Sequence, residues 1–253
     1  MTQHATFFAA LHATHTRTHE ELQAILANTD PVRLRTRPHP EMNTMVWSIW
    51  HSYRCEDACI GRFVVPEQQV LTTQNFNARM NIPYLGDGMG MTADDVLALS
   101  AAIDINALAA YGNAVTAQST KAYAYMADWD FGVSFTEAEV RAALTTYADL
   151  ASDDGTGTIE YMLSMTKAEY VMKFLYGHSQ YHLGEISAID GQISGTRFSP
   201  GRHIDSARFS DYYTHHEQTD QRYPYDATSR PTTSPNRTRV GDSHWVRRER
   251  PQY

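Results

Sequence analysis

Hydrophobic residues recur every three or four positions over most of the first 190 residues. This spacing predicts amphipathic α-helices and gives no convincing β-strand. The richest stripe lies on the second predicted helix, where Val46, Ile49 and Trp50 share one side. The stripes together predict helices over 4–27, 43–64, 104–126, 136–150 and 158–189.

A long segment over 65–103 separates the second and third of these helices and is predicted to be a crossover. Within it, Thr92-Ala93-Asp94-Asp95 resembles a helix capping box, with Asp95 in the place usually held by Glu or Gln. Thr136-Glu137-Ala138-Glu139 is a cleaner capping box and opens the helix over 136–150. Long amphipathic helices with one long crossover favour an all-α fold, a four-helix bundle.

The periodic pattern stops after Gly195. Residues 196–253 hold few aliphatic side chains, several prolines and clusters of polar and charged residues, a composition typical of disorder. We therefore predict two parts, a helical bundle over 1–194 and a polar, disordered tail over 195–253.

The charge is uneven along the 253 residues. The net charge is −8, but the tail carries ten arginines against seven acids, so the tail is +3 and the bundle is −11. An acidic bundle argues against nucleic-acid binding, which needs clustered Lys and Arg. Two cysteines are too few for a disulfide framework, and no signal peptide or apolar membrane span is visible. We expect a cytoplasmic protein.

Two histidines, His178 and His182, lie four residues apart in a predicted helix. That spacing places both imidazoles on one face, one turn apart, where two nitrogens can bind one divalent metal ion. Glu185 lies three residues after His182 and joins the same stripe. His51 ends an apolar run on an earlier helix. Three histidines from two helices would leave coordination positions open, which is the pattern of a catalytic metal site.

These residues also have structural interpretations. A pair of helix-face histidines can be satisfied by hydrogen bonds, although the apolar neighbours of His178 and His182 would make unpaired imidazoles costly to bury. A lone histidine such as His51 is more often a core residue than a ligand. Glu185 has three candidate roles: a fourth ligand, an anchor for an imidazole N–H, or a general base.

Further polar residues lie close to this set in the sequence. His12, His15 and His19 on the first helix either extend the site, bind substrate or line the bundle, and lining is favoured. Cys55 and Cys59 continue the face of His51 and are interpreted as packing residues rather than zinc ligands. Two carboxylates just past His51 have either a site role or an exposed helix position: Glu56 and Asp57.

The order and spacing of these motifs resemble the DinB/YfiT-like superfamily of metal-binding four-helix bundles. In that family one ligand histidine ends an apolar or Trp-rich run on the second helix, as in Trp47-Ser48-Ile49-Trp50-His51. The other two come from an H-x-x-x-H on the last bundle helix, often followed by Gly-Glu-Ile, as in His178, His182 and Gly184-Glu185-Ile186. The resemblance covers about 1–194 and implies an up-down-down-up bundle with metal ligands His51, His178 and His182.

Characterised members of that superfamily include thiol-dependent S-transferases and isomerases that use thiols such as mycothiol or bacillithiol, and others are called metal-dependent hydrolases. A three-histidine set suits Zn, Ni or Fe, and the cation lowers the pKa of a bound thiol or water. The leading hypothesis is thiol-dependent transfer to a small electrophile, with Glu185 as support or base. The alternatives are a metal-dependent hydrolase and a non-catalytic helical binding or stress-response module. Family bundles often dimerise, so a homodimer is also expected.

Overall fold

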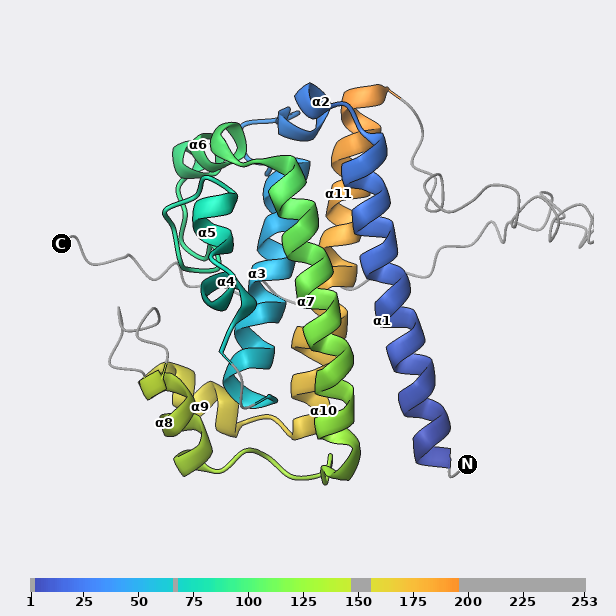
Figure 1. The fold of residues 1–253 in the computed structure, drawn as a ribbon, viewed down its shortest axis with the longest axis vertical. Helices are drawn as coiled ribbons and strands as arrows, with labels where there is room; N and C mark the ends of the chain where they lie inside the picture. The colour runs from blue at the N-terminus through green and yellow to red at the C-terminus, as the bar shows by residue number, and fades with distance from the viewer. Residues whose placement is uncertain (1–2, 66–67, 147–155, 196–253) are drawn as a thin grey trace, which may run out of the picture. The chain divides into compact units, whose positions relative to one another are not determined.

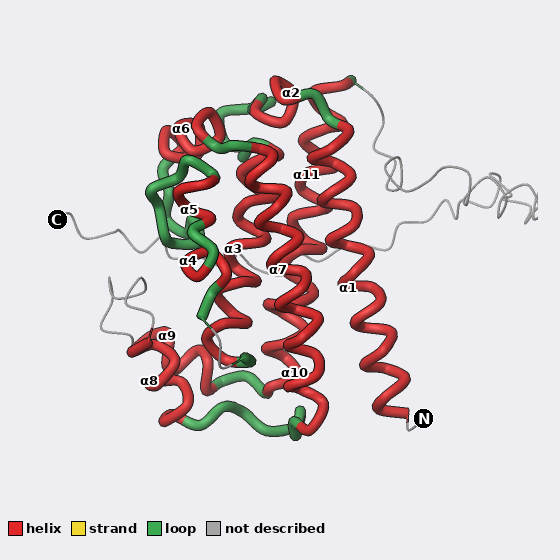
Figure 2. Tube along the Cα trace, viewed as in Figure 1, coloured by secondary structure: helices red, strands yellow, loops and turns green. Residues whose placement is uncertain are grey.

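The computed structural model describes residues 3–65, 68–146 and 156–195, and its regular elements in these ranges are helices (Figures 1 and 2). No strand forms there, and only an isolated antiparallel bridge joins Ser134 to Thr166. The all-α prediction is confirmed. No helix in these ranges is long and apolar enough to cross a membrane. The predicted disordered tail lies outside the described residues except for Gly195, and the division into two parts stays a prediction.

Four long helical segments lie side by side and carry the core (Figure 1). The central one, α3, packs against both α7 and the last segment. The first three of these segments start and end within a few residues of the predicted helices, and the last one does not. The predicted up-down-down-up order of the four stays a prediction. The four are α1 (Gln3–Asn28), α3 (Met45–Phe63), α7 (Ile105–Tyr125) and a composite of α10 (Lys167–Tyr170), the π-helical η3 (Val171–Gly177) and α11 (His178–Ser194).

The α3 helix is buried on nearly every side. Sixteen of its nineteen residues are buried, including the charged side chains of Arg54, Glu56 and Asp57. A buried charge is stable only when it is paired or hydrogen-bonded, so the surrounding elements must supply partners to α3. The packing of the whole bundle is therefore tied to a few polar residues on one helix.

Capping side chains fix where the central helices begin. The Thr44 hydroxyl accepts a hydrogen bond from the Trp47 N–H (3.1 Å) and so starts α3. The same hydroxyl lies 2.7 Å from the Ser100 hydroxyl on α6 (Ala93–Ala102), and α6 leads directly to Asp104, the N-cap of α7. Both α3 and α7 therefore begin at the same end of the bundle, and the chain between them has to return along its length.

That return is the predicted crossover, and it contains three short helices. They are α4 (Val70–Thr73), α5 (Phe76–Arg79) and α6, and α6 opens with the capping box formed by Thr92 and Asp95. The box predicted at Thr136 and Glu139 also forms, at the start of α8 (Glu137–Thr146). The predicted end of that helix near residue 150 lies outside the described residues.

The prediction of one continuous helix over 158–189 is wrong. The chain forms α9 (Thr156–Leu163), breaks, and restarts at Thr166, whose hydroxyl accepts from the Glu169 N–H while the Glu169 carboxylate accepts from the Thr166 N–H. This is a further capping box, and its Thr-x-x-Glu signature is visible in the sequence. A short α2 (Pro31–Arg35), capped by Asp30, was not predicted, although Pro at the first helical position is a common helix start.

Arg54 ties the crossover to α3 from inside the protein. Its guanidinium donates to the backbone carbonyls of Leu85 (2.6 Å) and Gly86 (3.1 Å) and lies 3.6 Å from Asp57. Asp57 in turn accepts from the Leu71 N–H and from the Tyr111 hydroxyl. One buried ion pair thus holds α4, α7 and the loop that follows α5.

We predict that Arg54→Ala destabilises the protein by about 3–5 kcal/mol, the cost of leaving one partner of a buried ion pair behind. The control is Arg79→Ala, which removes an exposed guanidinium that stacks over Phe76 and should cost about 1 kcal/mol or less. Urea unfolding followed by circular dichroism measures both values. Equal losses in the two variants would contradict the role given to Arg54.

Candidate metal centre

Three histidines predicted as ligands meet between α3 and α11. His51 comes from the middle of α3, and His178 and His182 come from the first two turns of α11. One ring nitrogen from each histidine lies within 4.8 Å of the other two. The His51 and His182 side chains are buried, and His178 is half-buried. The structure therefore brings the predicted set together from residues more than 120 positions apart.

Hydrogen bonds fix the tautomers of two of these rings. His51 Nδ1 lies 2.5 Å from the Asp87 carbonyl oxygen, which can only accept, so Nδ1 carries the proton. His182 Nδ1 lies 2.7 Å from Glu185 Oε2, and the ionised carboxylate likewise only accepts. Both rings then keep a lone pair on Nε2. Metal-binding histidines commonly show this arrangement, in which the other ring nitrogen donates to a carbonyl or carboxylate.

His178, the third ring of the cluster, has a nitrogen without a partner. Its Nε2 atom is buried and has no hydrogen-bond partner among the described residues. Burial and then the neighbouring His182 and His51 rings lower the pKa of His178 to about 4, and burial also lowers the pKa of His51. Neutral imidazoles are the form that binds a metal, and an unpartnered buried nitrogen is costly unless something satisfies it. The residues present therefore fit a divalent cation.

Glu185 lies behind His182. Its carboxylate accepts from His182 Nδ1, from the Ser48 hydroxyl (3.1 Å) and from the Asn43 side-chain amide (3.0 Å). Burial raises the pKa of Glu185, but the hydrogen bonds from His182 and Asn43 outweigh it and hold the pKa below its usual range. Among the three roles considered for Glu185, this geometry suits an anchor for the imidazole N–H.

The two cysteines and His12 lie beside the centre. Cys55 Sγ is 3.7 Å from the His51 ring nitrogens, and burial raises the pKa of this thiol well above its usual value. Burial likewise raises the pKa of Cys59 to about 11. Both cysteines are thus neutral thiols near pH 7, consistent with packing roles. His12 packs against the ring of Tyr123 at 4.5 Å between centroids.

His15, His19 and Glu56 form a second cluster, whose ligand atoms also lie within 4.8 Å of one another. All three side chains are almost completely buried. The two histidines had been interpreted as lining the bundle. The sequence carried one overlooked signal, since they are four residues apart, as are His178 and His182. Nothing local distinguished Glu56 from an exposed helix carboxylate.

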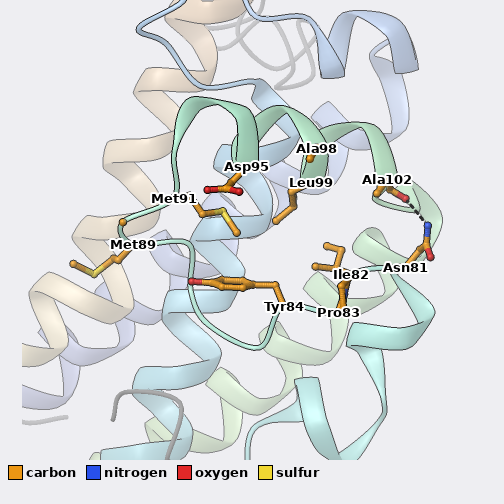
Figure 3. A pocket seen from close by; sticks show the side chains of 11 residues that line it. Asn81, Ile82, Pro83, Tyr84, Met89, Met91, Asp95, Ala98, Leu99 and Ala102 are labelled. Atoms are coloured by element: carbon orange, nitrogen blue, oxygen red, sulfur yellow. Dashed lines mark hydrogen bonds between the residues drawn. The ribbon is translucent and has the colours of Figure 1, made fainter. Parts of the chain in front are cut away.

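A mainly apolar hollow of about 480 Å³ lies within the crossover, between its loop and α6 (Figure 3). Tyr84, Met89 and Met91 line it together with Leu99 from α6. Met91 Sδ accepts a hydrogen bond from the Trp47 indole N–H (3.4 Å), and the Trp47 ring stacks on His51 with centroids 4.7 Å apart. The wall of the hollow and the histidine cluster are thus linked through one tryptophan.

These features define a helical protein with a buried three-histidine cluster next to a crossover loop. A family model for the DinB superfamily matches residues 14–186, so the chain belongs to the DinB superfamily. The matched region contains His51, His178 and His182. No curated protein matches the chain.

Gly88 holds the crossover loop against the centre. It has a φ of +99°, and a Cβ there would lie 2.8 Å from the Trp50 ring, 3.0 Å from the Trp47 ring and 3.4 Å from His51 Nδ1. Gly90 also has a positive φ (+80°), but a Cβ there would meet nothing within 4 Å. Both glycines therefore adopt a positive φ, but only at Gly88 would a Cβ atom collide with neighbouring side chains.

We predict that alanine at either glycine costs about 1–2 kcal/mol for the left-handed backbone. Gly88→Ala should cost a further ~1–3 kcal/mol, because the loop has to move away from the two tryptophans. Urea unfolding of the two variants gives the difference directly. If Gly88→Ala and Gly90→Ala are equally stable, the loop does not pack on the centre as described.

Proposed function

We propose that the protein is a divalent-metal-dependent enzyme that transfers a low-molecular-weight thiol to a small electrophile. In this proposal His51, His178 and His182 are the metal ligands. The observation that carries it is the unpartnered, buried Nε2 of His178, next to two rings whose Nδ1 protons are already engaged. Such an atom suits a cation, and the cation is Zn, Ni or Fe on the chemistry of the donor set.

Three neutral imidazoles would leave the cation its full +2 charge and at least one open coordination position. A bound cation of this kind lowers the pKa of a thiol or water and so supplies the nucleophile. The donor set supports the coarser part of the proposal, metal-assisted activation of a small nucleophile. The choice of a thiol over water rests on the superfamily's known chemistry, with mycothiol or bacillithiol as candidate thiols.

The chain's own residues orient the ligands and exclude water. The Asp87 carbonyl and the Glu185 carboxylate each hold one imidazole by its Nδ1 proton. We propose Glu185 as a positioning residue, because both of its oxygens already accept hydrogen bonds from Asn43, Ser48 and His182. Trp47 covers one face of the His51 ring, which keeps that side of the centre dry.

We predict that turnover needs both a metal and a thiol. The assay follows consumption of an epoxide, an alkyl halide and an α,β-unsaturated carbonyl with mycothiol, bacillithiol or glutathione as co-substrate. Chelation should abolish activity. His178→Ala should lower kcat/KM more than ~100-fold, since loss of a ligand exceeds the 10–100-fold effect of losing a ligand's hydrogen-bond partner. His39→Ala, on the connector before α3, should retain wild-type activity.

The same assay separates the proposal from its alternatives. Metal-dependent turnover that proceeds equally well without thiol would contradict thiol transfer and indicate a hydrolase. No turnover in the metal-loaded protein across the whole panel would contradict the enzymatic assignment and indicate a helical binding module.

A further inference from the structure

The second cluster lies between α1 and α3 and shares no residue with the three-histidine centre. His15 and His19 are one turn apart on α1, and both face Glu56 on α3. His15 is 2 % exposed, His19 is 1 % exposed and Glu56 is fully buried. His15 Nε2 lies 3.0 Å from Glu56 Oε1, and His19 Nε2 lies 2.8 Å from Glu56 Oε2. A carboxylate and two imidazoles thus converge in a region closed to solvent.

The proton positions on His19 follow from its neighbour on α7. The Thr116 hydroxyl donates its single hydrogen to the Gly112 carbonyl (2.8 Å). The same hydroxyl lies 2.6 Å from His19 Nδ1, and with its hydrogen on the Gly112 carbonyl the Thr116 oxygen accepts from a protonated Nδ1. In that tautomer the neutral ring has a lone pair on Nε2, the nitrogen that lies within hydrogen-bond distance of Glu56 Oε2. Two acceptors at that distance repel each other unless a cation lies between them or the ring takes a second proton.

His15 distinguishes these two explanations. Its Nε2 is within hydrogen-bond distance of Glu56 Oε1, yet it makes no hydrogen bond, which means that the ring nitrogen is not aimed at that oxygen. Glu56 Oε1 instead accepts from the Ser119 hydroxyl. Ligands of one cation point to a shared centre rather than at each other, and bonds of about 2.0–2.2 Å place tetrahedral donors ~3.4 Å apart, so the pairs at 3.0 and 2.8 Å would separate slightly around an ion. The unpartnered His15 nitrogen fits that arrangement.

The Glu56 carboxylate is fully buried and has few other polar partners. Beyond the two histidines, its polar contacts in the described chain are the hydroxyls of Ser119 and Ser179. A buried carboxylate needs a positive counterpart, which is either a bound cation or a proton on one of the two histidines.

We propose that His15, His19 and Glu56 bind a second divalent cation inside the bundle. Two imidazole nitrogens and one carboxylate are a common donor set for zinc and for ferrous iron. This site is independent of the proposed function, because it uses none of the residues assigned to the three-histidine centre. Its cation would join α1 to α3, whereas a cation at the three-histidine centre would join α3 to α11.

The test is metal stoichiometry on the full chain, purified without a histidine tag, stripped with a chelator and reloaded with Co²⁺ or Zn²⁺. Elemental mass spectrometry counts the bound ions, and the Co²⁺ absorption spectrum reports on each site. We expect two equivalents in the wild type, one in His15→Ala, one in His178→Ala and none in the double variant. His12→Ala, one turn before His15 on the same helix, should keep two.

The outcomes for the two sites are distinguishable. One equivalent that persists in His178→Ala and is lost when His15→Ala is added supports the second site, whatever happens at the first. A His178→Ala protein that folds by circular dichroism but binds no metal overturns it and leaves a proton-charged His–Glu cluster. His178→Ala leaves the second cluster intact, so the test does not depend on whether His15→Ala folds.

Discussion

The burial of α3 is the constraint on which the rest of this structure depends. The helix lies at the centre of the bundle, yet it carries a histidine, an arginine and two carboxylates that water cannot reach. Each of these groups would cost several kcal/mol if it were left unpaired in the interior. Their partners must come from the surrounding segments, so the polar residues of α3 select which elements pack around it.

The crossover, α7, α1 and α11 can each be assigned to one of these groups. Arg54 and Asp57 hold the crossover and α7 through backbone carbonyls, amides and Tyr111. Glu56 faces α1, where it meets His15 and His19. His51 faces α11 and the loop around Asp87. The same interactions that specify the bundle therefore also orient the groups that form the two clusters.

Much of the fold could be predicted from periodicity, because a long apolar stripe defines both a helix and its buried face. The stripes predicted α1, α3 and α7 to within about two residues of their ends. The break before Thr166 was missed, because the apolar pattern continues across it and only the capping box marks the restart. The π-helical η3, which leads into His178, has no signature in the pattern of apolar positions.

The site was predictable only where its residues are neighbours on one helix or carry a family pattern. The spacing of His178 and His182 indicated a ligand pair, and the apolar run ahead of His51 matched the superfamily. Glu56 was not recognised, since its partners lie 37 and 63 residues away and only folding brings them together. The Asp87 contact to His51 is made by a backbone carbonyl, which no side-chain motif reveals.

We propose that hydrogen bonds orient two imidazoles, His51 and His182, to bind one cation together with the unpartnered ring of His178. The most direct test is anomalous scattering from crystals of the protein loaded with Zn²⁺ or Co²⁺. We predict a peak about 2.0–2.2 Å from Nε2 of His51, His178 and His182, with the Nδ1 hydrogen bonds to Asp87 and Glu185 intact. A loaded crystal with no peak among these three rings, or with a metal bound through Nδ1 of His51 or His182, would contradict it.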